Sequence, residues 1–118
     1  YLQCARVLMD TKRAQRLGKA LADKVASEID ASQIDMVVAP AMGGLIIGYE
    51  VARQLGKPSI FCERVDGVFA LRRGFALNPG ARVLVVEDVV TTGISSRETF
   101  ECIEKQGGKV VVECSLID

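Results

Sequence analysis

The stretch "VLVVEDVVTTGISSRE" combines acids, hydroxyls and a glycine at a spacing that could perform chemistry. Glu87 and Asp88 end a run of aliphatic residues, and a core strand has no use for two acids at its tip. Thr91, Thr92 and Gly93 then precede a helical pattern. The first turn of a helix has unpaired N–H groups and a partial positive charge, and glycine lets an anion approach the backbone, so this loop could cradle a phosphate. The acids would suit sugar hydroxyls, directly or through hydrated Mg²⁺. The alternative is a helix N-cap that follows two exposed acids.

Two residue types limit the chemistry that the chain could perform. It has no histidine, which excludes a Ser-His-Asp triad, a histidine-ligated metal and the commonest general base. Its four cysteines are scattered without a Cys-x-x-Cys pair. Reduced thiols in a cytoplasmic protein are therefore favoured over a disulfide framework or a zinc site. An enzyme built on this chain would work mainly by positioning and electrostatics, or would use carboxylates.

Charge and hydropathy exclude further classes of partner. Lys plus Arg is 15 and Asp plus Glu is 15, so zero net charge gives no electrostatic argument for a nucleic-acid or membrane partner. No apolar run reaches the roughly 18 residues that cross a bilayer. The chain starts without Met and stops just after an apolar run, so we expect it to be part of a longer protein.

Strand and helix patterns alternate along the chain. Four apolar runs predict buried strands at 35–40, 58–63, 81–87 and 109–117. Three amphipathic segments predict helices at 11–28, 45–56 and 94–108. The segment 64–80, interrupted by glycines and a proline, predicts a mobile, hairpin-like loop. The alternation predicts one α/β domain over residues 1–118, with a mostly parallel sheet flanked by helices. In such sheets ligands bind at the carboxyl ends of the strands.

The order of aliphatic strand, Glu-Asp, two aliphatics, Thr-Thr-Gly and helix resembles the phosphoribosyl-pyrophosphate (PRPP) signature of type I phosphoribosyltransferases. The resemblance implies that Glu87 and Asp88 bind the ribose 2′- and 3′-hydroxyls. It also implies that the loop after them wraps the 5′-phosphate. That loop consists of Val89, Val90, Thr91, Thr92, Gly93, Ile94 and Ser95.

The segment "APAMGGLIIGYEVARQLGKPSIFCERVDG" narrows the resemblance to the orotate phosphoribosyltransferases. In that family a Pro-Ala turn binds pyrophosphate, and here the turn is Pro40-Ala41-Met42-Gly43-Gly44. Many relatives carry Lys where this chain has Gly43, so we expect the turn to bind through backbone N–H groups. The family's loop is commonly rich in Lys and contains His, whereas this one offers Arg64, Arg72 and Arg73. Arginine is a forked donor suited to pyrophosphate oxygens, and the sequence leaves open which of the three acts.

The resemblance implies transfer of ribose 5-phosphate from PRPP to orotate, giving orotidine 5′-phosphate and pyrophosphate in de novo pyrimidine biosynthesis. It implies Mg²⁺ held mainly by PRPP, pyrophosphate and water, with no protein metal ligand, and a cytoplasmic homodimer. Thr91 would contact orotate, and the hood segments over the base would lie before Tyr1 and after Asp118. Two alternatives stay open: a purine-type phosphoribosyltransferase and a non-catalytic PRPP-binding regulator. The sequence lacks GxGxxG and GxxxxGK[ST], which disfavours a generic nucleotide-binding domain.

Overall fold

A five-stranded sheet with the order β3-β2-β1-β4-β5 forms the centre of the molecule. The computed structural model describes residues 4–89 and 94–117. The strands are β1 (Met36–Pro40), β2 (Ser59–Val65), β3 (Val68–Leu71), β4 (Arg82–Val89) and β5 (Lys109–Ile117). All adjacent pairs are parallel except β2–β3, which is antiparallel. The predicted mostly parallel sheet is therefore confirmed.

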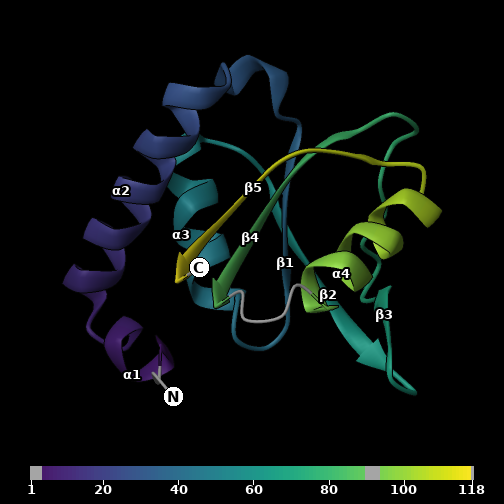
Figure 1. The fold of residues 1–118 in the computed structure, drawn as a ribbon, viewed down its shortest axis with the longest axis horizontal. Helices are drawn as coiled ribbons and strands as arrows, with labels where there is room; N and C mark the ends of the chain where they lie inside the picture. Colours follow the sequence, from purple (N-terminus) through teal and green to yellow (C-terminus); the bar gives the residue numbers. More distant parts are fainter. Residues whose placement is uncertain (1–3, 90–93, 118) are drawn as a thin grey trace.

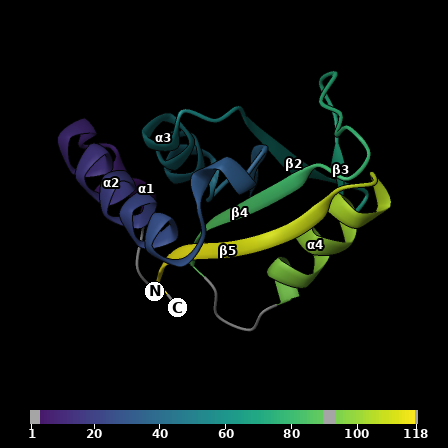
Figure 2. The same ribbon diagram turned by 90° about the horizontal axis from the view of Figure 1, so that it is seen from above.

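Helices cover both faces of this sheet (Figure 2). One face carries α1 (Cys4–Leu8), α2 (Thr11–Glu28) and α3 (Leu45–Leu55), and the other carries α4 (Ile94–Lys105). A 3₁₀ turn, η1 (Ala31–Gln33), leads from α2 into β1. Among the described residues, no helix has both the length and the apolar content that crossing a membrane requires.

The two central strands contain unbroken aliphatic runs because both of their faces are buried. Successive residues of a strand point to opposite faces. In β4, Leu84 and Val86 pack in the core beneath α2 and α3, whereas Val83 and Val85 pack in the core beneath α4. The pairing of β4 with β5 shifts by one residue between Val83 and Leu84. This irregularity decides which face each later residue of β5 occupies.

Local signals account for the helix ends. The carboxylate of Asp10 accepts hydrogen bonds from the backbone N–H groups of Lys12 and Arg13, which caps α2 at its predicted start. Helix α3 ends at Gly56, whose φ of 69° is a left-handed conformation that glycine adopts without strain. The three predicted helices and four predicted strands are all present, with ends that differ by at most three residues.

The predicted loop 64–80 contains a fifth strand that the sequence analysis missed. Val65 pairs with Val68 across a two-residue turn at Asp66 and Gly67, whose φ values of 53° and 83° fit a tight hairpin turn. The hairpin part of the prediction is confirmed, while the absence of a strand there is wrong. The short run Val68–Leu71 becomes a strand because the tight turn brings it to the edge of β2 opposite β1, where it finds backbone partners. Its mobility stays a prediction.

Candidate active site

The carboxyl ends of β1 and β4 lie side by side at the switch point of the sheet. β1 pairs with β2 on one side and with β4 on the other, and β4 in turn pairs with β5. Connections therefore leave these two ends in opposite directions, which opens the crevice where ligands of such sheets bind. Figure 1 shows the arrow of β4 ending near the turn that joins β1 to α3. The structure thus brings the two predicted motifs together.

The turn after β1 folds tightly onto the end of β4. The Gly44 N–H donates to the Pro40 carbonyl at 3.0 Å, and the Ala41 N–H donates to the Cys62 carbonyl at 2.8 Å. A Cβ added at Gly44 would lie 2.9 Å from the Pro40 oxygen and 3.1 Å from the Val86 oxygen. Because both obstacles are backbone atoms, only glycine fits there. The peptide bond between Ala41 and Met42 is cis, and the Met42 side chain is exposed.

Gly43 lies directly against the carboxylate of Asp88. A Cβ at position 43 would lie 2.5 Å from Asp88 Oδ2 and 2.9 Å from Asp88 Oδ1. Asp88 Oδ1 also accepts a hydrogen bond of 2.8 Å from the Val89 N–H. The space that a longer side chain at position 43 would enter is therefore occupied by the acid predicted to bind ribose. A side chain at position 43 would therefore have to displace the Asp88 carboxylate.

The two adjacent acids point to opposite faces of the sheet. Asp88 follows Leu84 and Val86 in the strand's alternation and therefore lies on the α3 side, beside the turn. Glu87 follows Val83 and Val85 and lies on the α4 side. The exposed fraction of Glu87 is 2%, so the alternative of two exposed acids is wrong for this residue.

Glu87 sits among polar groups from two neighbouring elements. The Ser96 hydroxyl of α4 donates a short hydrogen bond to Glu87 Oε2. Burial raises the pKa of Glu87 to about 7; the Ser96 hydrogen bond opposes this rise, and the carboxyls of Glu113 and Asp88 add to it. Glu113 comes from β5, and its Oε2 is buried without a hydrogen-bond partner among the described residues. Sequence reasoning missed Glu113, although a lone acid in the apolar run of β5 was a usable signal.

The three arginines predicted to bind pyrophosphate all form ion pairs with glutamates. Arg64 contacts Glu98 of α4 at 2.7 Å and lies over the ring of Phe69, 4.2 Å from its centroid. Cys62 is the last residue of β2 that pairs with β1, and Arg64 lies two residues beyond it. Arg64 is therefore at the carboxyl edge of the sheet, where the candidate site lies.

Arg72 and Arg73 share one partner and occupy a different level of the sheet. They contact Glu63 at 3.8 Å and 3.2 Å. Because β3 runs antiparallel and its last residue, Leu71, pairs with Cys62, these two arginines lie back from the carboxyl edge. Within this chain the structure therefore places Arg64 nearer to that edge than the other two.

The predicted phosphate loop is described only in part. Val90, Thr91, Thr92 and Gly93 lie outside the described residues. The described part consists of the end of β4 at Val89 and the start of α4 at Ile94, which includes the backbone of Ser95. Residues 87–89 and the amino end of α4 thus bracket the predicted loop. Its contacts with phosphate stay a prediction.

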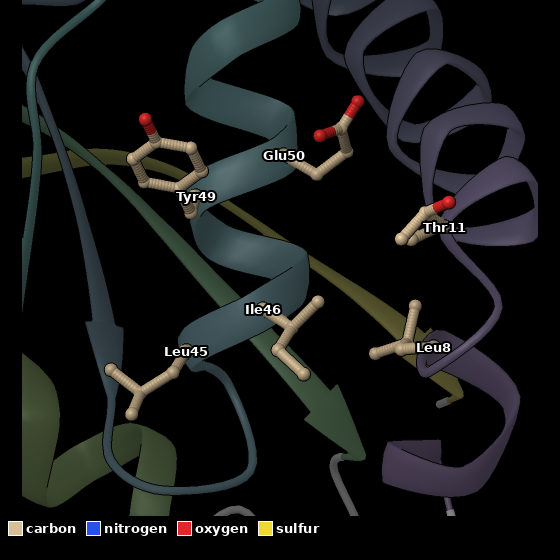
Figure 3. Close-up of a pocket in the computed structure, with 7 residues that line it drawn as sticks. Leu8, Thr11, Leu45, Ile46, Tyr49 and Glu50 are labelled. Carbon is tan, nitrogen blue, oxygen red and sulfur yellow. The ribbon is translucent and has the colours of Figure 1, made fainter.

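An apolar groove of about 340 Å³ lies beside the turn, between α1, the start of α2 and α3 (Figure 3). We call it the α1–α3 groove. In Figure 3, Leu8 and Ile46 face one another across it. Its lining comprises Leu8, Thr11, Ala14, Leu45, Ile46, Tyr49 and Glu50. Large apolar side chains stand exposed in its lining and in neighbouring segments, including Met9, Met42 and Tyr49, the last with an exposed fraction of 64%.

Comparison with protein families and curated relatives gives a consistent result. The profile of the phosphoribosyl transferase domain matches residues 8–118. The chain is 64% identical over its full 118 residues to orotate phosphoribosyltransferase of Erythrobacter litoralis, and 63% identical to that of Sphingopyxis alaskensis. It covers 61% and 60% of those proteins, so the chain spans about three fifths of the length of these relatives.

Solved structures share the architecture. A crystal structure of adenine phosphoribosyltransferase has a TM-score of 0.83 over 94% of this chain and 72% of its own, and at 18% identity it shows the fold alone. Orotate phosphoribosyltransferase from Aeropyrum pernix has a TM-score of 0.74 and is 26% identical, over 98% of this chain and 64% of its own.

Proposed function

This chain belongs to the phosphoribosyl transferase domain family, and we propose that it acts as an orotate phosphoribosyltransferase. The reaction would transfer ribose 5-phosphate from PRPP to orotate, giving orotidine 5′-phosphate and pyrophosphate for pyrimidine biosynthesis. The observation that carries the proposal is the contact between Asp88, at the tip of β4, and Gly43, in the turn after β1. The names and identities of the curated relatives support orotate as the base.

In the proposed mechanism the chain holds the substrate and supplies no covalent nucleophile. The bond between C1 of ribose and pyrophosphate breaks, with its electron pair leaving on pyrophosphate. The orotate ring nitrogen bonds to C1 through an oxocarbenium-like transition state and loses its proton to pyrophosphate or water. Asp88 would accept from a ribose hydroxyl, while the turn's N–H groups would face the pyrophosphate. The start of α4 would face the 5′-phosphate. Each charge-assisted contact is worth about 1.5–3 kcal/mol.

The proposed reaction also uses Mg²⁺, which would bind together with PRPP. Among residues 4–89 and 94–117, no group of three or more His, Cys, Asp or Glu side chains is arranged to hold a metal ion. We propose that PRPP, pyrophosphate and water supply most of the ligands of the ion.

We also propose that the protein works in the cytoplasm as a homodimer. The exposed apolar side chains at the α1–α3 groove favour a protein partner there, because clustered exposed apolar surface marks interaction sites. The family resemblance implies that the basic hairpin reaches the neighbouring subunit's site. That arrangement would give Arg72 and Arg73 a role that their position within one chain does not provide.

The decisive experiment follows pyrophosphate release by the complete natural protein with PRPP, Mg²⁺ and one base at a time. We expect turnover with orotate and none with adenine or hypoxanthine. Turnover with a purine instead would overturn the choice of base. PRPP binding without turnover of any base would make the protein a regulator.

Calorimetry tests the binding site itself. We expect Glu87→Ala/Asp88→Ala to lose PRPP binding. The double variant Glu101→Ala/Glu104→Ala removes two acids from the exposed face of α4 and is a matched control that should bind normally. Equal affinities for the two double variants would contradict the proposed site.

A further inference from the structure

A second acid lies behind the tip of β4. In the shifted register of the β4–β5 pair, Glu113 lies opposite Val85, and Ser115 lies opposite Glu87. Paired residues of neighbouring parallel strands share a face, so Glu113 and Glu87 both point toward α4. In the part of the chain that the structure describes, Glu113 Oε2 is buried without a hydrogen-bond partner, and Glu87 is almost fully buried. Two carboxyls therefore meet in a place from which water is largely excluded.

The groups around Glu87 cannot balance two charges. From α4 it receives the Ser96 hydroxyl, and from β5 it faces Glu113. Asp88 on its own strand adds like charge. On the β2 side lies Cys62, whose thiol is neutral because burial raises its pKa to about 12. No described lysine or arginine forms an ion pair with Glu87.

A single proton on the two carboxyls would remove the charge repulsion and supply the missing hydrogen-bond donor. Two buried carboxylates close together repel, and neither can donate a hydrogen bond to the other. If one carboxyl is neutral, its O–H supplies the donor that the buried oxygen lacks. Burial raises the pKa of Glu87, so near neutral pH the carboxyl of Glu87 can hold this proton.

We propose that Glu113 and Ser96 are positioning residues that hold the Glu87 carboxyl from behind, with one proton shared between the two glutamates, and that this trio sets the pH range over which the site binds PRPP. The last part rests on the proposed function. The trio itself rests only on the register of β5, the Ser96 hydrogen bond and the unpartnered oxygen of Glu113.

The two positioning residues act in opposite directions, which gives a sharp test. Glu113→Gln removes the like charge and supplies an amide donor, so Glu87 ionises at lower pH. Ser96→Ala removes a donor to the carboxylate, so Glu87 ionises at higher pH. Since the pKa of Glu87 is about 7, about a tenth of the Glu87 carboxyls are ionised near pH 6 in the wild type. If Glu113→Gln ionises all of them at that pH, PRPP binding there would tighten by up to about tenfold.

The experiment measures the Kd of PRPP by calorimetry from about pH 5.5 to about pH 9 on the complete natural protein. We expect the midpoint to move to lower pH in Glu113→Gln and to higher pH in Ser96→Ala. Glu104→Gln, an exposed change of equal charge on α4, should leave it in place. The titration of PRPP itself is common to all variants, so only differences between them count. Coincident profiles for Glu113→Gln and Glu104→Gln would overturn the proposal, and a uniform loss of affinity at every pH would reduce Glu113 to a structural role.

A second measurement needs no PRPP. Because the folded-state pKa of Glu87 is raised, the neutral form stabilises the fold below the unfolded pKa, and this stability is lost as pH rises through about 7. We expect urea unfolding to show this loss in the wild type and a smaller loss in Glu113→Gln. If the wild type and Glu113→Gln lose stability equally, the shared proton is refuted. If the stability difference appears but PRPP does not bind, the proposed function fails and the glutamate pair stands.

Discussion

Substitution of Gly43 by Ala should damage PRPP binding while leaving the fold nearly intact. The added Cβ would lie 2.5 Å from Asp88 Oδ2, which is closer than Cβ atoms approach other atoms. The three nearest atoms all belong to the carboxylate of Asp88, at the far end of its side chain. The carboxylate can therefore move aside, and the turn keeps its path.

The structure separates the expected effects on stability and binding. The backbone at Gly43 is not in the left-handed region, so alanine fits and should stabilise by about 0.4–1 kcal/mol through the unfolded chain, offset by displacement of Asp88. We therefore expect the net change in unfolding free energy to stay within about 1 kcal/mol. A displaced carboxylate loses a charge-assisted contact with ribose worth about 1.5–3 kcal/mol, which is roughly a 10-fold to 100-fold increase in the Kd of PRPP.

Gly48→Ala is the matched control, because the same substitution there meets a rigid obstacle. Its Cβ would lie 2.6 Å from the Cβ of Ala39, where α3 packs closely on β1. Neither atom can rotate away, so the helix must shift. Overpacking of this kind costs about 1–3 kcal/mol of stability. The folded fraction should still bind PRPP as the wild type does.

Urea unfolding and calorimetric titration with PRPP on the three proteins give the comparison. The reasoning requires that Gly43→Ala rank lowest in affinity and Gly48→Ala lowest in stability. Wild-type affinity in Gly43→Ala would show that the position of the Asp88 carboxylate does not matter for binding. A large loss of stability in that variant would show that the turn, rather than the side chain, gives way.

Three further predictions concern residues outside the turn. Asp35 accepts hydrogen bonds from Arg82, which lower the pKa of Asp35 to about 2. Asp35→Asn should therefore unfold more readily than the wild type above about pH 4, and this difference should be lost as the pH falls through about 2. Circular dichroism can follow the unfolding of both proteins. Equal curves at neutral pH would contradict this. Buried Cys62 and Cys102 have raised pKa values, so both thiols should react with a thiol reagent only after unfolding; fast reaction in the native state would be incompatible with their burial. Glu98→Gln breaks the partly exposed pair with Arg64 and should lower the unfolding free energy only slightly, and less still in high salt. A salt-independent loss would argue against an ion pair.

Elements with strong local signals were predictable from sequence. Helix α2 begins where Asp10 caps it, and its apolar spacing continues to Glu28. The run of β4 is aliphatic because both faces are buried, and this alone predicted a central strand. Strand β3 was not predictable in the same way. Its four residues form a strand because they pair with the edge of β2 across the turn at Asp66 and Gly67. Whether that edge is available depends on distant parts of the sheet.

The candidate site likewise has features that were predictable from sequence and others that were not. Its location at the ends of β1 and β4 follows from the alternating pattern, and the opposite orientation of Glu87 and Asp88 follows from strand geometry. The role of Glu113 could not be derived, because one shift in register fixes its face. Without the shift between Val83 and Leu84, Glu113 would lie opposite Val86 and point toward α3. Sequence periodicity contains no signal for a single irregularity of this kind.

The register of β5 also has a consequence for the order in which the protein matures. On the ribosome Glu87 emerges well before Glu113, and until β5 docks nothing on that side covers the acid or shares its proton. The β1–α3 turn and the tip of β4 can meet earlier, because their pairing does not involve β5. A nascent chain would therefore bring the β1–α3 turn and the tip of β4 together first, and would place Glu113 beside Glu87 only when β5 docks.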